Sequence, residues 1–395
     1  YKNIYKLKPG EIISFNLKEN FQAQNYIYWS PIGKIDEKIF IDDEFYELFS
    51  SSVNYRLESD VPVANFLSGG LDSSSIIKNL FDNNKDINTF SAIYSDKKYD
   101  ESLWIESVKE KYQTNHIQEK LDLNLDFETL LEVINVFDEP YCDPSIIPSY
   151  MLSRSISKEY KVAISGDGGD ELLGGYIRTS LSLNEPNMFK SLYSNIYSFY
   201  PSFLGTGNHF LKNKRSISDR YASFFEDRKL MSIIGIDDYS EFKNEIFVNL
   251  EDEYKSLLAT DYNFYLPEMM MLKVDRTSMA NSLEVRSPFV DHRLIEYVMS
   301  HDTNYFDTTN QKLLLKKYLS DDFNDDFINR RKMGFVFNLE SFIFSNLDKI
   351  KQHLTQNNQH LENNLDILRK LSKNKSRINA IRILKLIIFA EFTKV

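Results

Sequence analysis

Short apolar segments alternate with segments of helical periodicity in the first half of this chain. The stretches "DVPVANFL", "INTFSAIYS" and "KVAIS" predict strands, and apolar residues recur at helical spacing in the segments 41–56, 74–81, 99–112 and 147–160. A chain in which strands alternate with helices forms a parallel sheet with crossover helices. We therefore predict an α/β fold, with a parallel sheet and flanking helices at about residues 55–180 and a mostly helical lobe at about residues 181–395.

The charge and the apolar content of the chain limit which partners it can bind and where in the cell it can be located. Its 395 residues carry a formal net charge of −11, which disfavours nucleic acid as a main partner because it repels a phosphate backbone. The apolar segment "ILKLIIFAEF" contains a lysine and a glutamate and is shorter than the roughly 18 apolar residues that span a bilayer. The start of the chain lacks the pattern of a secretory signal, and Cys142 is its single cysteine. We expect a cytoplasmic protein without a membrane partner.

A glycine turn, "LSGGLDSS", follows the first predicted strand directly. Parallel sheets bind ligands at the carboxyl ends of their strands, where loop amides and a helix N-terminus converge on an anion. Gly69 and Gly70 let the backbone approach a phosphate closely, and Ser68 and Ser73 add hydroxyl donors. Asp72 would repel a phosphate unless a cation intervenes, so the turn predicts Mg²⁺ together with a nucleotide. The alternative is a plain strand-to-helix turn in which Asp72 caps the helix.

A second glycine turn, "SGDGGDE", follows the third predicted strand and contains Asp167, Asp170 and Glu171. Acidic side chains this close repel one another unless a cation and a phosphate chain lie between them. The two turns together favour a phosphate and metal site over the alternative of a solvated loop with a helix cap.

Five motifs resemble the synthetase domain of glutamine-dependent asparagine synthetases, from about Asp42 to the end of the chain. The motifs are "DVPVANFLSGGLDSS", "DEPYCDPSIIPSYMLSR", "ISGDGGDELLGGY", "MLKVDRTSMANSLEVRSPFVDHRL" and "RRKMGF". The resemblance implies a PP-loop ATP-pyrophosphatase fold, in which ATP is cleaved between its α and β phosphates.

The resemblance also implies roles for individual residues. Lys332 would supply the lysine that the first turn lacks, and Asp72 and Asp170 would hold Mg²⁺. The residues implied to bind ATP or its pyrophosphate are Leu67, Ser68, Gly69, Gly70, Asp72, Ser73, Ala92, Ser165 and Gly166.

The family's chemistry activates a carboxylate by adenylation and then lets ammonia attack the acyl-adenylate, so the implied substrates are ATP, a carboxylate and ammonia or glutamine. Mg²⁺ and Lys332 would stabilise the leaving pyrophosphate. Asp167 is the candidate base for the ammonia step, although asparagine synthetases often carry glutamate at that position. We expect aspartate as the acceptor and asparagine and AMP as products, in a chain that is compatible with a homodimer.

Three alternatives stay open at this point. The first is a relative that acts on another carboxylate, such as a sugar uronate of a surface polysaccharide or a peptide. The second is a PP-loop sulfurtransferase that acts on tRNA, which the acidic balance and the lone Cys142 oppose. The third is a nucleotide-binding module without catalytic activity.

Two further groups of residues have both a functional and a structural interpretation. The residues before the helix at 147–160 either touch the acceptor or form loop contacts and caps: Asp138, Glu139, Asp143 and Ser145. The residues of "KVDRTSMANSLEVRSPF" either close on the active site or pair with one another: Asp275, Arg276, Glu284 and Arg286. The six histidines show no metal-ligand spacing.

The first 33 residues resemble the end of an N-terminal glutaminase domain, in the stretches "IYKLKPGEIISFN" and "YIYW". That domain carries an N-terminal cysteine nucleophile, whereas this chain begins with Tyr1. We therefore expect residues 1–33 to be the tail of a glutaminase domain in a longer protein, and residues 34–395 to be the synthetase-like domain.

Overall fold

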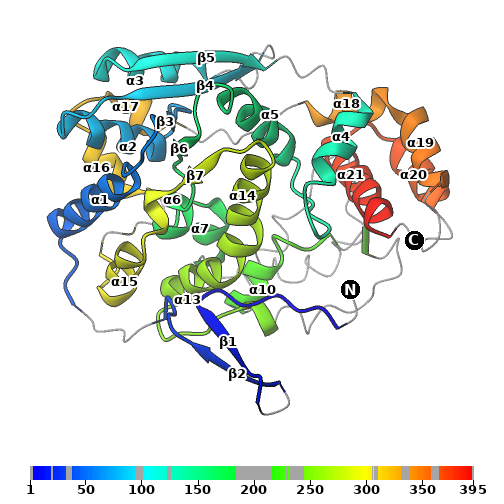
Figure 1. The fold of residues 1–395 in the computed structure, drawn as a ribbon, viewed down its shortest axis with the longest axis horizontal. Helices are drawn as coiled ribbons and strands as arrows, with labels where there is room; N and C mark the ends of the chain where they lie inside the picture. The colour runs from blue at the N-terminus through cyan, green and yellow to red at the C-terminus, as the bar shows by residue number, and fades with distance from the viewer. Residues whose placement is uncertain are drawn as a thin grey trace, which may run out of the picture.

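A parallel sheet with helices on both sides occupies one half of the molecule (Figure 1). The computed structural model describes residues 3–18, 21–32, 38–94, 101–121, 126–183, 216–227, 230–231, 244–304, 306, 310–330, 338–356 and 364–393. The sheet has the strand order β5-β4-β3-β6-β7, and all four neighbouring pairs run parallel. Its strands are β3 (Val63–Phe66), β4 (Asn88–Tyr94), β5 (Asn115–Leu121), β6 (Val162–Ile164) and β7 (Glu284–Arg286).

The predicted α/β fold is confirmed, and two strands were missed by the sequence patterns. β5 and β7 are the two edge strands of the sheet. β5 reads "NHIQEKL", which is too polar to stand out as a buried strand, and β7 has only three residues. Edge strands need fewer apolar residues than central strands, because one side of each is open. β7 belongs to the half of the chain that the patterns predicted as mostly helical.

The order of the strands places a switch point between β3 and β6. The chain leaves β3 for β4 and β5 on one side and returns on the other side to β6. Connections that leave neighbouring strands in opposite directions open a crevice at the carboxyl ends of those strands, and ligands bind there in open α/β sheets. The two glycine turns follow β3 and β6, so both lie at this crevice.

Helices cover both faces of the sheet, because the side chains of each strand alternate between the two faces. Val63 packs against the larger core cluster on one side, and Ala64 belongs to a separate cluster with α5 on the other side. The first side carries α1 (Asp42–Arg56), α2 (Leu71–Asp82), α3 (Ser102–Tyr112) and α16 (Leu313–Leu319), and the second side carries α5 (Ile146–Ile156) and α14 (Leu272–Met279).

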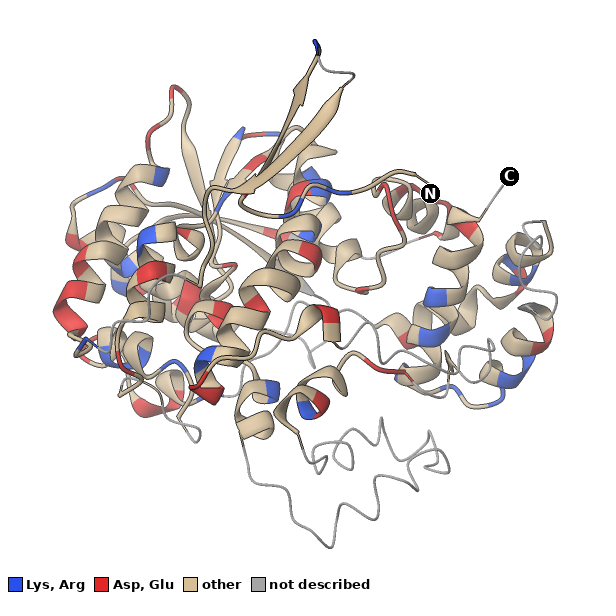
Figure 2. Ribbon diagram, turned by 90° about the horizontal axis from the view of Figure 1, so that it is seen from below, with Lys and Arg blue, Asp and Glu red and all other residues tan. Residues whose placement is uncertain are grey.

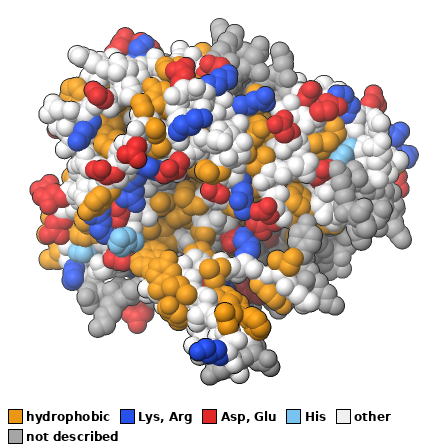
Figure 3. Space-filling view, viewed as in Figure 1, with side chains coloured by type: hydrophobic (Ala, Val, Ile, Leu, Met, Phe, Trp, Pro, Cys, Tyr) orange, Lys and Arg blue, Asp and Glu red, His pale blue; other side chains and the backbone are white. Residues whose placement is uncertain are grey.

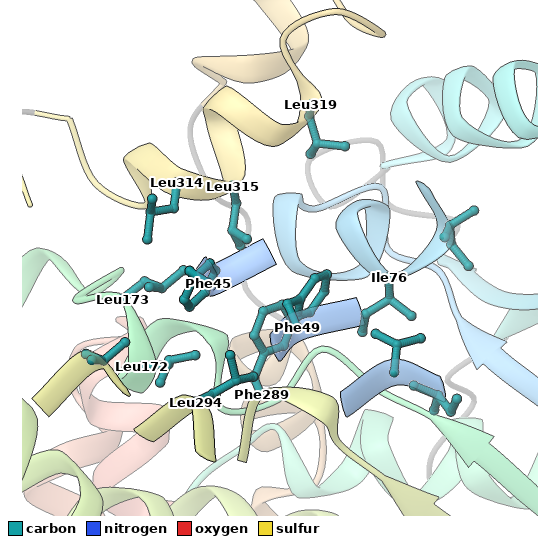
Figure 4. Packing of buried hydrophobic residues seen from close by; sticks show 14 of the residues in the cluster. Phe45, Phe49, Ile76, Leu172, Leu173, Phe289, Leu294, Leu314, Leu315 and Leu319 are labelled. Carbon is teal, nitrogen blue, oxygen red and sulfur yellow. The ribbon is translucent and has the colours of Figure 1, made fainter. Parts of the chain in front are cut away.

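The larger core holds the elements of the crevice in place. Phe45 and Phe49 of α1 are fully buried and lie among leucines of α16 and of the segment after the second glycine turn (Figure 4). The ring of Phe49 stacks on that of Phe289 with centroids 5.0 Å apart. Full burial of one such side chain contributes about 1.5–3 kcal/mol to folding.

A second core joins helices from distant parts of the chain at the other end of the molecule. Leu130, Ile147 and Ile383 are fully buried there, in a cluster formed by α4 (Phe127–Ile134), α5 and the four C-terminal helices. Those four are α18 (Leu339–Ser345), α19 (Leu347–Gln356), α20 (Asn364–Ser372) and α21 (Arg377–Phe392). The other described helices are α6 (Gly169–Leu172), α7 (Ile177–Leu183), α10 (Ile217–Ala222), α13 (Glu253–Thr260), the π-helix η4 (Asp261–Met271), the 3-10 helix η5 (Pro288–Val290), α15 (His292–Ser300) and α17 (Asp325–Ile328).

A two-stranded hairpin near the start of the chain projects away from the rest of the molecule (Figure 1). Its antiparallel strands are β1 (Glu11–Asn16) and β2 (Gln22–Ile27), paired in register from Glu11 with Ile27 to Asn16 with Gln22. Nearly every residue of both strands is exposed. Across the described ranges, no helix is at once long and apolar enough to cross a bilayer.

Candidate active site

The two glycine turns touch each other at the switch point. A Cβ atom on Gly169 would lie 2.5 Å from Oδ1 of Asp72, and one on Gly166 would lie 2.8 Å from Cβ of Asp72. Only glycine fits this close approach, so the sequence of the second turn is matched to the position of Asp72 in the first. Figure 3 shows a hollow in the middle of this face, lined by hydrophobic side chains and bordered by acidic and basic ones.

Lys312 joins the acidic side chains of the two turns. Its Nζ lies 2.6 and 2.5 Å from the carboxylate oxygens of Asp72 and 2.7 Å from Oδ1 of Asp170. The lysine is only 7% exposed, and it precedes α16 with φ 55° and ψ 40°. A non-glycine residue in this left-handed region costs of order 1 kcal/mol or more and is common at functional sites. Asp72 and Asp170 thus lie close together, and the ammonium group of Lys312 lies between them.

The first turn is held by its own serines. Gly69 adopts φ 66° and passes close to Trp104, where a Cβ atom would lie 2.7 Å from the Cβ of the tryptophan. The hydroxyl of Ser73 donates to the carbonyl of Gly70, and its oxygen lies 3.2 Å from the hydroxyl oxygen of Ser68. α2 begins after Gly70 without a side-chain cap, so Asp72 does not serve as the helix cap that the structural alternative required.

The predicted adenosine-side residues lie along the same edge. Leu67 is buried, and its N–H donates to the carbonyl of Phe90, where β3 ends. Ala92 lies two residues beyond that point in β4, past the end of β3. The N–H of Ser165 donates to the carbonyl of Arg286, and its buried hydroxyl has no hydrogen-bond partner among the described residues. This edge of the sheet therefore presents backbone groups and the hydroxyl of Ser165, which could hydrogen-bond to a ligand.

Arg330 brings the start of the "RRKMGF" motif to the first turn. Its guanidinium donates to the carbonyl of Gly69 at 2.5 Å, lies 3.4 Å from Oε1 of Glu101 and sits 5.2 Å from the ring centre of Trp104. Lys332, the lysine predicted to serve this site, lies outside the described residues. Neither Arg330 nor Lys312 was among the predicted site residues.

Behind the second turn lies a buried charged network. The guanidinium carbon of Arg178 lies 3.6 Å from the ring centre of Tyr176 and 3.9 Å from that of Tyr265, and an amino group of Arg178 lies 2.9 Å from Asp261. The hydroxyl of Tyr176 donates to Glu171 at 2.6 Å. Burial, with the nearby charge of Asp170, raises the pKa of Glu171 to about 7. This carboxyl is therefore protonated in a large fraction of the molecules near neutral pH.

The raised pKa of Glu171 predicts that the protein becomes less stable as pH rises from about 5 to 8. The ordinary value is 4.5, so the unfolded chain loses this proton first as pH rises, and the folded state keeps it until about pH 7. The loss is on the order of 3 kcal/mol. Glu171→Gln cannot titrate, so its melting temperature should fall less than that of the parent between pH 5 and pH 8. Parallel changes in both proteins would contradict this pKa.

Asp167 lies beside a wall built from the loop before α5. Its backbone carbonyl accepts from the hydroxyl of Ser287, and its side chain is half-buried. Burial raises the pKa of Tyr141, and the carboxylates of Asp143 and Asp167 add to this, so both acids lie near that phenol. The hydroxyl of Tyr141 donates to the carbonyl of Met269 in η4 at 2.5 Å. Tyr141 thus joins the loop before α5 to η4.

The other charged residues singled out in the sequence form ion pairs. Arg286 lies 2.6 Å from Glu284 and donates to the backbone carbonyls of residues 56 and 58. Arg276 lies 2.5 Å from Asp138 and 3.7 Å from Asp275. These contacts fit the structural interpretation of that motif. Figure 2 shows that acidic and basic residues are mixed along the helices. Within the described ranges, no group of three or more histidine, cysteine, aspartate or glutamate residues could hold a metal ion.

Comparison with known proteins gives a family and several relatives. The family model described as asparagine synthase matches residues 44–376. Three Bacillus subtilis (strain 168) proteins named asparagine synthetase [glutamine-hydrolyzing] are similar to this chain. Number 1 is 25% identical over 378 residues, which cover 90% of this chain and 59% of the relative. Number 3 is 27% identical, covering 84% and 54%, and number 2 is 26% identical, covering 85% and 45%. The chain thus spans roughly half the length of these relatives.

Proposed function

The chain belongs to the asparagine synthase family, and we propose that it is an ATP-dependent ligase domain that converts aspartate, ATP and ammonia into asparagine, AMP and pyrophosphate. The observation that carries this proposal is the meeting of the two glycine turns at the switch point, with Asp72, Asp170 and Lys312 in direct contact. A nucleotide bound there would have its phosphates at the N-terminus of α2, where the amides and the serine hydroxyls of the first turn converge.

Lys312 has a position suited to the leaving pyrophosphate. Its ammonium is held by two carboxylates and is otherwise largely enclosed by protein, so water screens its charge only weakly. A fixed cation stabilises charge that develops on a leaving group, and this effect is large where water is excluded. Lys332 is proposed as a second cation for the phosphates, and this is supported by Arg330 of the same motif, whose guanidinium contacts Gly69.

The two carboxylates also fit Mg²⁺. The ion takes oxygen ligands and is commonly held by one or two carboxylates together with substrate phosphates. Asp72 and Asp170 approach a single Nζ atom within 2.7 Å, so one cation can contact both of them. Bound Mg²⁺ would neutralise charge on the pyrophosphate as it leaves. Lys312 would then turn from the carboxylates toward the phosphates.

Asp167 is proposed as the base of the second step. Ammonia that attacks the acyl-adenylate forms an ammonium-like species, which must lose a proton before AMP departs. The proposal is supported by the position of Asp167 in the second turn, directly after Gly166, which lies close to Asp72.

Sulfur transfer to tRNA is the weaker candidate. A sulfurtransferase needs a reactive thiolate, whereas burial raises the pKa of Cys142 and favours its neutral thiol.

The absence of a nucleic-acid partner, a cytoplasmic location and a homodimer stay predictions of the sequence.

Residues 1–33 are proposed to be the tail of a glutaminase domain that supplies ammonia from glutamine. The hairpin exposes large hydrophobic side chains, which lie at the lower edge of the face in Figure 3. Phe15 is 59% exposed, Phe21 66% and Ile27 68%, and isolated two-stranded hairpins are at best marginally stable. Such a hairpin is expected to pair and pack against further strands.

The nucleotide product tests the proposed reaction directly. We expect the purified chain, supplied with ATP, Mg²⁺, aspartate and ammonium, to release AMP and pyrophosphate in equal amounts, because the phosphate site holds the β and γ phosphates as the leaving group. Chromatography of the nucleotides distinguishes AMP from ADP. ADP as the main product would contradict the proposed adenylation. Turnover with a uronate but not with aspartate would show that the acceptor is a uronate.

A further inference from the structure

Lys273 is a buried cation that the proposed phosphate chemistry does not use. It lies in the first turn of α14 and is 7% exposed. Its Nζ lies 3.2 Å from the hydroxyl of Ser145, 3.7 Å from the sulfur of Met270 and 3.9 Å from Oδ2 of Asp143. An ammonium has three N–H donors, yet among the described residues its hydrogen-bond partners are one neutral hydroxyl and one thioether. Burial of a charge with such weak partners is costly, so the site is suited to an anionic ligand.

Asp143 provides the opposite charge in the same place. Its Oδ1 accepts from the backbone N–H of Ser145 at 2.9 Å, which fixes the carboxylate at the entrance to α5. Its Oδ2 points toward Lys273 at a distance too long for a direct hydrogen bond. A positive and a negative group are thus held beside each other without being fully paired.

This pair belongs to the wall near Asp167. Tyr141 of the loop before α5 donates to the carbonyl of Met269 in η4, and Lys273 contacts the sulfur of Met270 in the same π-helix. Tyr265 of η4 connects the wall to the second glycine turn, because its ring centre lies 5.4 Å from that of Tyr176, whose hydroxyl donates to Glu171. The reacting carboxylate of the acceptor would lie beside Asp167. The other groups of the acceptor molecule would then reach this wall.

We propose that Lys273 and Asp143 form the subsite that binds the α-carboxylate and the α-ammonium group of an amino-acid acceptor. This inference rests on the proposed adenylation at the neighbouring phosphate site. A carboxylate can take the unused donors of Lys273, and an ammonium can take the free face of Asp143, so the pair matches a zwitterion. A sugar uronate carries no ammonium group and would leave Asp143 without its charge partner.

Analogues of aspartate separate the two roles. Succinate lacks the amino group, and β-alanine lacks the α-carboxylate. Lys273→Met should raise the KM for aspartate at least tenfold and weaken the binding of succinate by the same factor, because both ligands lose a charged hydrogen bond to their carboxylate. The same variant should leave β-alanine unchanged. Asp143→Asn should weaken aspartate and β-alanine but not succinate. Analogue binding is measured as the inhibition constant against aspartate, and KM for ATP should change less than about threefold.

The control is Asp275→Asn, which removes an acid from the same helix at a position that is 58% exposed in its side chain. It should leave all three acceptor constants unchanged. If Lys273→Met fails to fold, Asp143→Asn still tests the pair, because that loop side chain is partly exposed. Parental affinity for aspartate in both variants would overturn the subsite while leaving the proposed function intact. Adenylation of a uronate and of no amino acid by the parent would overturn the acceptor in the proposed function and this subsite together.

Discussion

Asp72→Asn is expected to lose at least a hundredfold in amide-forming rate while its melting temperature stays equal to that of the parent or rises. The rate falls because one of the two carboxylates that position the cation at the leaving phosphates is lost. Stability does not fall because the parent cluster of Asp72, Asp170 and Lys312 carries a net negative charge, and the asparagine makes it neutral. Asp170→Asn should behave in the same way.

Steady-state rates at saturating ATP, with melting curves of the same preparations, check this result. The matched control is Asp82→Asn at the other end of α2, where the side chain is 43% exposed and 3.4 Å from Lys78. It should keep the parental rate. An Asp72→Asn protein that retained more than a tenth of the parental rate would show that this carboxylate does not hold the reacting phosphates.

Lys312→Ala is expected to lose both activity and stability, and Mg²⁺ should restore part of the stability. Without the ammonium, two carboxylates face each other at the switch point, and removing one partner of a buried ion pair typically costs about 3–5 kcal/mol. A divalent cation between Asp72 and Asp170 replaces the missing charge, so Mg²⁺ should raise the melting temperature of this variant more than that of the parent. The rate should fall at least a hundredfold.

Two comparisons make the result specific to Lys312. Lys317→Ala, on the same helix, removes a side chain that is 49% exposed and paired with Asp42, so it should keep both activity and stability. Lys332→Ala should lose activity but keep its melting temperature, because we propose that this lysine acts on the phosphates alone. Equal melting temperatures for Lys312→Ala and Lys317→Ala would contradict the bridging role. If Mg²⁺ did not raise the melting temperature of Lys312→Ala, the proposed metal site would be contradicted.

Much of the site could be predicted because its key residues are close together in sequence. The turns around Gly69 and Gly169 follow apolar strands, and glycine next to aspartate at two such points has few explanations besides an anion site with a cation. The same patterns predicted α1 and the three inner strands, because these segments are buried and their apolar periodicity is regular.

The residues that the patterns missed share a physical reason. Lys312 lies in "NQKLLLKKYL", where one lysine among several near an apolar helix looks like any solvated side chain. Only the packing of α16 against α2, driven by buried leucines, brings it to Asp72 across 240 residues of chain. Arg330 reaches Gly69 across 261 residues in the same way.

The sequence by itself determined the parallel α/β sheet, the two glycine turns and the family, because each depends on local periodicity or on motifs of adjacent residues. The tertiary structure decided which charges meet at the ends of β3 and β6. It placed Lys312 rather than a nearby residue between the two acids, and it left Lys273 buried beside Asp143. Such choices depend on how helices far apart in the chain pack their apolar faces, and that packing is a property of the whole core.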